Sequence, residues 1–377
     1  MDDILQSIGR HFEIPGRFLH ANALGRGHIH DTFVAVFEHG GAEHRYVHQR
    51  LNTHVFRDPE SLMDNVVRIS DHLDRKLRAR GIPDPDRRRL VVVRTRDGDP
   101  FCTDPDGSPW RTFRYQEGTR SCDAIEGPAL AYEAARAFGA FAELMSDLPP
   151  PPLTVTIPHF HDLEQRFAGL EAALRADAHG RVAAVRDEIE QASCEYERLR
   201  TAFAAVSAEP VPRRTVHNDC KLDNLLFDAT TGEVRCVIDL DTVMEGTVVC
   251  DFGELVRTGT CAAAEDERDL EAMRFQPELF DALARGYLAG VGALLSDAEI
   301  HALPLAGPCL TLENAIRFLT DHLEGDVYFR IHRENHNLDR CRAQLRRVQL
   351  QLEHREAAHA SIERAAGPHA ARPKAAQ

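Results

Sequence analysis

Three polar residues in the second half of the chain have the types and order that phosphoryl transfer requires. Asp219 and Asn224 lie in the segment TVHNDCKLDNLLFD, and Asp239 follows the apolar run CVI further on. Phosphoryl transfer needs a carboxylate that orients an acceptor hydroxyl and accepts its proton, and oxygen ligands that hold Mg²⁺ on the phosphates. Asp219 is our candidate for the first role, and Asn224 and Asp239 are our candidates for the second.

The spacing His217-x-Asp219-x-x-x-x-Asn224 is typical of the catalytic loop of kinase-like folds. We interpret His217 as a hydrogen-bonding brace of this loop. Residues 225–227 are predicted to form a strand, TTGE a hairpin turn, and residues 237–238 a returning strand that brings Asp239 beside Asn224. A surface hairpin with incidental acidic residues is the alternative interpretation. The joint occurrence of loop, hairpin and final aspartate favours the functional one.

The first third of the chain has the pattern of a small antiparallel β lobe. Strands separated by the turn segments GRGHIHDT and HGGAE are expected from Leu24 to Arg50, and two more follow a helix. The predicted order is therefore βββαββ after an initial short helix. The helices are expected at 2–12 and 59–80, and the two later strands at 90–95 and 110–116.

The remainder of the chain is mainly helical by apolar periodicity. Helices are expected at 128–147 and 179–207, short strands within 212–244, and helices again from about 264. We therefore predict an α+β, two-lobed, protein-kinase-like fold with a small β-rich N-lobe and a larger helical C-lobe. The predicted boundaries are 1–117 for a nucleotide-binding lobe, 118–364 for a catalytic and acceptor-binding lobe, and 365–377 for a disordered tail.

Composition limits the classes of partner. The formal net charge is −15, with no basic stripe to offset it, so nucleic acid is not expected as a partner. Nine scattered cysteines without a CxxC pair favour a reducing compartment over a disulfide framework or a zinc ribbon. No apolar run approaches the ~20 residues of a membrane span. We expect a cytoplasmic protein that binds no membrane.

The segments HNDCKLDN and VIDLDTV resemble the aminoglycoside phosphotransferase and choline kinase superfamily. Within it, the chain is most similar to the N-acetylhexosamine 1-kinases. That likeness continues through GRGHIHDTF, YVHQRLNTHVF, DPESLMDNV and LENAIRFLTDHLEGDVYFRIHRENHNLDR. The resemblance implies ATP- and Mg²⁺-dependent phosphorylation of the anomeric hydroxyl of GlcNAc or GalNAc. The alternatives are a kinase of an aminoglycoside, choline, homoserine or another sugar, and a degenerate kinase-like binding module.

The nucleotide-binding candidates come from the predicted N-lobe. Gly25, Gly27 and His28 form a turn that is expected to contact the ATP phosphates, because glycine permits close backbone approach. Kinase-like folds carry a lysine on the third strand, where this chain has Gln49 and Arg50. Strand alternation directs Gln49 toward the nucleotide and Arg50 to the other face. A bulge in the strand would let Arg50 serve as the phosphate cation, and the alternative for Arg50 is a surface cation. Gln116 belongs to the expected hinge at 113–118, where backbone groups meet the adenine edge.

The acceptor-binding candidates are Asp219 itself, Lys221, Arg317 and Tyr328. Lys221 either lies close to the transferred phosphoryl group or forms a salt bridge with Asp223 or Asp228. Arg317 and Tyr328 match the acceptor-binding positions that the resemblance implies. The alternative for those two is a buried ion pair and a core tyrosine.

Two further groups of residues have types that can act at a metal. Asp241 is interpreted as an acid behind the metal ligand Asp239. The order H-x-E-x-H at His332–His336 does not match a zinc protease.

Overall fold

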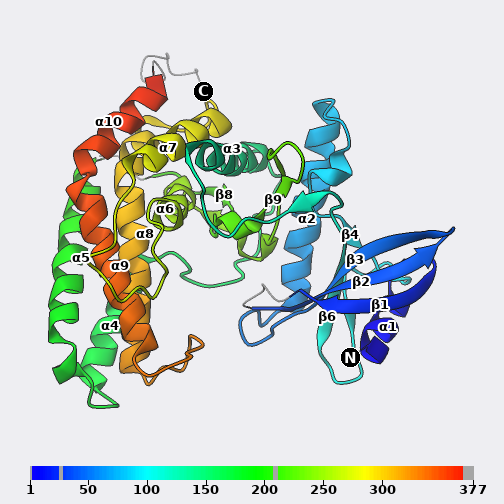
Figure 1. Cartoon of the computed structure of the whole chain (residues 1–377), viewed down its shortest axis with the longest axis horizontal. Helices are drawn as coiled ribbons and strands as arrows, with labels where there is room; N and C mark the ends of the chain where they lie inside the picture. Colours follow the sequence, from blue (N-terminus) through cyan, green and yellow to red (C-terminus); the bar gives the residue numbers. More distant parts are fainter. Residues whose placement is uncertain (1, 25–28, 207–210, 368–377) are drawn as a thin grey trace. The chain divides into compact units, whose positions relative to one another are not determined.

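The structure is a computed structural model that describes residues 2–24, 29–206 and 211–367. The chain divides into two compact units, each built from several segments. The first unit contains Met1–Arg120, Asp147–Pro158 and Leu225–Met244. The second unit contains Ser121–Ser146, His159–Asn224 and Glu245–Gln377. Figure 1 shows the strands gathered mainly in the first unit and the helices mainly in the second.

An antiparallel sheet forms the centre of the first unit (Figure 1). Its strands lie in the order β1-β2-β3-β6-β4, and β5 pairs with β6. The helix α1 (Asp2–His11) packs against this sheet through Leu5 and Ile8, which share a core with Phe37 and Trp110. The strand bounds are β1 Arg17–Ala23, β2 Asp31–His39, β3 Ala42–Arg50, β4 Val92–Val93, β5 Cys102–Thr103 and β6 Pro109–Arg114. The antiparallel β lobe predicted from the sequence is confirmed.

Two strand boundaries differ from the prediction. The strand region begins at Arg17 rather than Leu24, in a segment where half-buried and exposed residues hide the alternation. Only Val92 and Val93 of the expected strand 90–95 pair with β6. Thr95 instead forms an isolated bridge with Phe12.

The helix α2 (Pro59–Ala79) begins as its sequence predicts. The Asp58 carboxylate accepts a hydrogen bond from the backbone N–H of Ser61 at 3.1 Å, and Pro59 occupies the first helical turn, where its missing N–H costs nothing. Leu62, Val66 and Ile69 are buried at helical spacing.

The hairpin predicted after Asn224 is present in the first unit. The strands β9 (Leu225–Asp228) and β10 (Val234–Val237) pair antiparallel, with Val237 opposite Leu225. The Asp228 carboxylate accepts hydrogen bonds from the N–H groups of Thr230 and Thr231, which fixes the turn. The short strand β7 (Thr119–Arg120) pairs with β9, and the short 3₁₀ turn η4 (Leu240–Thr242) and β11 (Met244–Gly246) follow β10.

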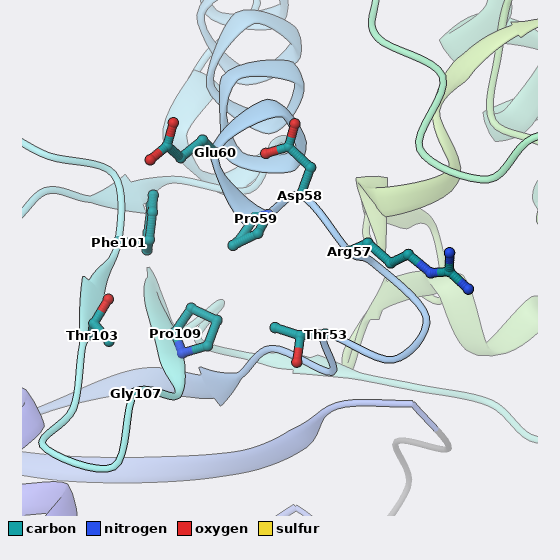
Figure 2. Close-up of a pocket in the computed structure, with 9 residues that line it drawn as sticks. All are labelled: Thr53, Arg57, Asp58, Pro59, Glu60, Phe101, Thr103, Gly107 and Pro109. Atoms are coloured by element: carbon teal, nitrogen blue, oxygen red, sulfur yellow. The ribbon is translucent and has the colours of Figure 1, made fainter.

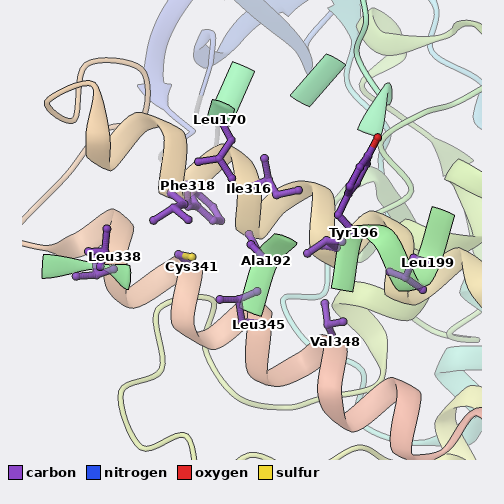
Figure 3. Packing of buried hydrophobic residues seen from close by; sticks show 14 of the residues in the cluster. Leu170, Ala192, Tyr196, Leu199, Ile316, Phe318, Leu338, Cys341, Leu345 and Val348 are labelled. Atoms are coloured by element: carbon purple, nitrogen blue, oxygen red, sulfur yellow. The ribbon is translucent and has the colours of Figure 1, made fainter. Parts of the chain in front are cut away.

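The second unit is a helical assembly in which a cluster of buried hydrophobic side chains lies among α4, α5, α8 and α9 (Figure 3). Leu170, Tyr196, Ile316 and Leu345 come from these four helices and are buried in that cluster. The helix bounds are α3 Pro128–Met145, α4 Leu163–Ala176, α5 Arg186–Val206, α6 Val248–Gly259, α7 Pro277–Val291, α8 Asp297–Leu323, α9 His336–Glu353 and α10 Arg355–Ala366. The strand β8 (Arg214–Val216) and the 3₁₀ turn η3 (Leu222–Asn224) also belong to this unit.

The structure differs from the sequence prediction at three helices of this unit. The long helix expected at 179–207 begins only at Arg186, because residues 182–184 form a 3₁₀ turn. The helix α4 was missed, since it buries only Leu170 and Ala173 and its apolar periodicity is weak. The helix α6 was also missed. Its paired valines and two glycines have low helix propensity, so helices resume at Val248 rather than at 264.

The end of the chain differs in part from the expected tail. The helix α10 includes residues 365 and 366, and residues 368–377 lie outside the described part. Within the described residues, no helix is both long enough and apolar enough to cross a membrane.

Candidate active site

The loop that carries Asp219 is anchored by α6 within the second unit. After β8 the backbone turns through Asn218, whose φ of 65° lies in the left-handed region. The carboxylate of Asp251 accepts the N–H of His217 at 3.1 Å and that of Asn218 at 2.7 Å. Burial raises the pKa of Asp251. One buried side chain of α6 therefore fixes the backbone immediately before Asp219.

The side chain of Asp219 contacts two residues of its own loop. Lys221 Nζ lies 2.7 Å from one carboxylate oxygen, and Asn224 Nδ2 donates to the other at 2.9 Å. Burial by itself would raise the pKa of Asp219, but Lys221, His217 and the hydrogen bond from Asn224 together outweigh it and hold this pKa below its ordinary value. The group is therefore a carboxylate near neutral pH, as the orientation of a hydroxyl requires.

Lys221 and His217 flank Asp219 in this loop, and the structure gives contacts for both. The ion pair that the structure gives for Lys221 is with Asp219, whereas Asp228 pairs with Arg235 in the β9–β10 turn. The imidazole of His217 is buried against the edges of Phe138 and Phe141, and its Nδ1 accepts the N–H of Asp219 at 3.3 Å. Both contacts suit a brace of the loop.

Asp239 belongs to the first unit and follows β10. Its φ of 58° is left-handed, its side chain is exposed, and it precedes η4. The next acidic residue, Asp241, is buried and accepts Arg111 Nη1 at 2.5 Å and Nη2 at 2.8 Å. It also accepts His30 Nε2 at 2.6 Å. Burial would raise the pKa of Asp241, but the Arg111 guanidinium and the His30 imidazole together outweigh burial and lower it.

The chemistry of the candidate metal ligands suits Mg²⁺. Asp239 offers carboxylate oxygens. The amide nitrogen of Asn224 donates to Asp219 Oδ2 at 2.9 Å and to the Asp219 carbonyl at 2.7 Å, so its oxygen points to the other side. Mg²⁺ keeps waters and phosphate oxygens and needs only one or two protein ligands. In the described part of the chain, no group of three or more His, Cys, Asp or Glu side chains could bind a metal.

The predicted nucleotide residues are engaged by protein contacts where the structure describes them. Gly25, Gly27 and His28 lie outside the described residues. Gln49 donates to Thr32 Oγ1 at 3.0 Å and accepts Arg111 Nε at 2.9 Å, whereas Arg50 is exposed and pairs with Asp31. Gln116 is buried and donates to the carbonyls of Asp86 and Arg89.

Arg317 and Tyr328 lie near each other in the second unit. The guanidinium carbon of Arg317, on α8, is 5.9 Å from the Tyr328 ring and 5.2 Å from the Phe329 ring. The Tyr328 side chain is 64% exposed, which does not match the alternative of a core tyrosine. The buried carboxylate of Asp321 accepts the N–H groups of residues 327, 328 and 329 at 2.7–2.9 Å, so it fixes the loop that carries Tyr328.

The sequence interpretation missed the residue that joins α8 to the catalytic loop. His161 Nε2 donates to the Asn218 carbonyl at 2.6 Å, and its Nδ1 lies 3.2 Å from a Glu313 carboxylate oxygen. Both ring nitrogens thus face acceptors, which is the arrangement of a protonated imidazolium. Burial would lower the pKa of His161, but the Glu313 carboxylate, the Asn218 carbonyl and Glu254 together outweigh burial and raise it. The only local signal was its place in the segment HFH after Pro158.

Two other features contain none of the predicted site residues. A cavity of about 350 Å³ lies at the start of α2 in the first unit, lined by Arg57, Asp58 and Glu60 among others (Figure 2). In the H-x-E-x-H segment, His336 Nε2 pairs with Asp266 at 3.0 Å.

Comparison with known proteins places these observations in a family. The model of the phosphotransferase enzyme family, APH, matches residues 21–300. A microcompartment-associated aminopropanol kinase is 17% identical, with 95% of this chain and 98% of that chain covered and a TM-score of 0.56. An aminoglycoside phosphotransferase from Alicyclobacillus acidocaldarius is 15% identical, with 95% of each chain covered and a TM-score of 0.58. A choline kinase from Cryptosporidium parvum is 15% identical, with 96% and 97% covered and a TM-score of 0.53. At these identities the structural likeness shows the fold, and the predicted kinase-like fold is confirmed.

Proposed function

Because the chain belongs to the phosphotransferase enzyme family, we propose that it transfers the γ-phosphoryl group of ATP to the anomeric hydroxyl of an N-acetylhexosamine. The product would be the sugar 1-phosphate. At the coarser level the protein is a kinase-like phosphotransferase that acts on an alcohol group of a small molecule. We propose the identity of the acceptor and the residues that bind it.

Asp219 is the proposed catalytic base. Its carboxylate is ionised near neutral pH and is oriented by Lys221 and Asn224, so it can accept the proton of the attacking hydroxyl. Lys221 lies on the same carboxylate and supplies a positive charge close to where the phosphoryl group would transfer. Asp239 and Asn224 are the proposed Mg²⁺ ligands, and the ion would neutralise charge on the phosphates.

The paired arrangement of Arg317 and Tyr328 is the single observation that supports a polyhydroxylated acceptor. An exposed phenol beside a guanidinium offers several directional donors and an aromatic face, which suits a ring that carries hydroxyl and amide groups. The loop of Tyr328 is preorganised by Asp321, so little ordering is needed on binding. Unpaired cysteines throughout the described residues accord with the cytoplasmic location that we propose.

An acceptor screen tests this proposal. The purified chain would be incubated with ATP and Mg²⁺ and with GlcNAc, GalNAc, glucose, an aminoglycoside, choline, homoserine or aminopropanol, and the formation of ADP measured. We expect turnover with the two N-acetylhexosamines and a ³¹P signal of an anomeric phosphate. The Asp219→Asn variant and a chelator are the controls. If the enzyme prefers an amino alcohol or an aminoglycoside, the proposed acceptor is wrong. If none of these acceptors leads to ADP formation, the sugar-kinase proposal as a whole is wrong.

A further inference from the structure

We propose that Arg111 is a positioning residue for the metal ligand Asp239, and that it acts through the buried carboxylate of Asp241. The inference rests on the proposed role of Asp239. All of the residues in the argument lie in the first unit. Arg111 is on β6, far from Asp241 in the chain, and the two side chains are 2% and 1% exposed.

The contact between Arg111 and Asp241 is bidentate. Arg111 Nη1 donates to one carboxylate oxygen at 2.5 Å and Nη2 to the other at 2.8 Å. A fork-to-fork pair fixes the orientation of the carboxylate as well as its position. Because Asp241 lies within the 3₁₀ turn η4, which Asp239 precedes, the pair fixes the turn that carries the proposed ligand.

His30 and Thr156 complete the attachment of this turn. Asn52 N–H donates to His30 Nδ1 at 3.0 Å, so Nδ1 is an acceptor and Nε2 carries the proton that it donates to Asp241 at 2.6 Å. Thr156 Oγ1 donates to the Asp241 carbonyl at 2.8 Å. The turn is therefore attached to three separate segments through one residue.

Gln49 orients Arg111 from the neighbouring strand. The two residues are paired across β3 and β6, and Gln49 Oε1 accepts Arg111 Nε at 2.9 Å while its Nε2 donates to Thr32. The amide thus directs the remaining two nitrogens of the guanidinium toward Asp241. A lysine at position 49 would place a positively charged donor beside Arg111 Nε, which now donates to Gln49 Oε1. Glutamine therefore suits this cluster better than lysine.

The left-handed backbone of Asp239 explains why its turn needs an anchor. For a non-glycine residue, a backbone φ of 58° is less favourable than a φ in the β or right-handed regions. Aspartate tolerates this conformation better than most residues. Such a conformation persists where the surrounding structure determines it. The Arg111–Asp241–His30 cluster holds the turn that Asp239 precedes, and so constrains the backbone of the proposed ligand.

The test is Arg111→Lys, which keeps the charge and removes the fork. Mn²⁺ affinity in the presence of ADP would be measured by electron paramagnetic resonance, together with the midpoint of thermal unfolding. We expect Mn²⁺ binding about 10-fold weaker or more, the usual size for the loss of a residue that orients a ligand. Raised Mg²⁺ should restore part of the turnover. Arg94→Lys is the matched control, because Arg94 is an exposed cation of the same unit that donates to Gly98, and it should bind Mn²⁺ as the wild type does.

The outcomes separate this inference from the proposed function. If Asp239→Asn weakens Mn²⁺ binding and a folded Arg111→Lys does not, the positioning role is wrong and the metal site stands. If neither variant changes Mn²⁺ binding, Asp239 is not a ligand and the proposed metal site is wrong. If Arg111→Lys does not fold, Thr156→Val removes a single donor to the same turn. That variant should then weaken Mn²⁺ binding a few-fold, and unchanged binding overturns the inference.

Discussion

The loops that carry Asp219 and Asp239 are both anchored by a buried aspartate, but the two aspartates accept different donors. Each loop passes through a non-glycine residue in the left-handed region, Asn218 in one and Asp239 itself in the other. Each is attached to its unit by a second, buried aspartate, Asp251 in one and Asp241 in the other. The aspartate proposed for chemistry is in both cases distinct from the aspartate that anchors the loop.

The two anchors differ in what they accept. Asp251 accepts two backbone N–H groups, whereas Asp241 accepts a charged guanidinium and an imidazole N–H. Breaking a buried ion pair leaves an uncompensated charge and costs about 3–5 kcal/mol, whereas losing acceptors for neutral donors costs about 1–3 kcal/mol. We infer that the Asp239 loop has the more specific anchor, and that losing this anchor costs more free energy of unfolding.

The largest expected effect separates the chemical roles of the two loops. Asp219→Asn should lower kcat by about 10²–10⁴-fold, because it removes a positioned general base. Asp239→Asn should instead raise the Mg²⁺ concentration needed for half-maximal turnover. Steady-state kinetics at varied Mg²⁺ measure both. A variant of Asp219 that keeps more than half of wild-type turnover, or an Mg²⁺ titration of the Asp239 variant that overlays the wild type, would remove the distinction.

The second prediction compares the anchors in free energy of unfolding. Asp241→Asn should destabilise the protein by about 3–5 kcal/mol, since Arg111 is left buried without a counter-charge. Asp251→Asn should cost about 1–3 kcal/mol, because one amide oxygen remains to accept a backbone N–H. Urea unfolding of both variants, with the exposed Asp31→Asn as a control, gives the two values. Equal losses would show that the charge of the Arg111 pair is unimportant.

The sequence predicted the chemical residues of both loops and placed Asp241 behind Asp239, but it predicted neither the partner Arg111 nor the anchor Asp251. Asp219, Asn224 and Asp239 could be predicted as a group because their spacing is local and a hairpin joins them, and that hairpin is present. Arg111 lies 130 residues from Asp241, and Asn218 lies 33 residues from Asp251. Such pairings depend on tertiary packing, which local periodicity does not encode. The same limit explains why the hydrogen bond from Arg111 to Gln49 was not predicted.

A third prediction concerns α8, which contacts the catalytic loop through Glu313 and His161. Arg317→Ala should lower kcat/KM for the acceptor by about 10–100-fold, because hydrogen bonds from a charged donor contribute about 1.5–3 kcal/mol. Tyr328→Phe should cost less, since it removes one hydroxyl. The KM for ATP should not change in either variant. Wild-type values of kcat/KM for both sugars in both variants would make these residues structural and would weaken the N-acetylhexosamine proposal.

The smallest expected effect is a pH dependence built into the Asp219 loop by His161. Its imidazolium bridges Glu313 on α8 and the Asn218 carbonyl, and Glu254 adds a further favourable charge. The pKa of His161 is raised in the folded protein, so its contribution to stability is fully present below about 6.5, the value of an unfolded histidine. That contribution is lost as the pH rises through the folded pKa, because the neutral ring can donate to only one of its two partners.

Titration of the His161 ring by NMR, with its signal assigned through its loss in His161→Phe, measures this pKa directly. We expect a midpoint above 6.5 in the wild type and a lower one in Glu313→Gln, because burial then acts without the opposing carboxylate. The free energy of unfolding of the wild type should fall more steeply above pH 6.5 than that of Glu313→Gln, since each unit of pKa difference is worth about 1.4 kcal/mol. The control is Glu324→Gln, which neutralises an exposed acid at the C-terminal end of the same helix. A wild-type midpoint at or below 6.5 would mean that the Glu313 carboxylate does not outweigh burial, and the loop of Asp219 would then be joined to α8 by a neutral hydrogen bond.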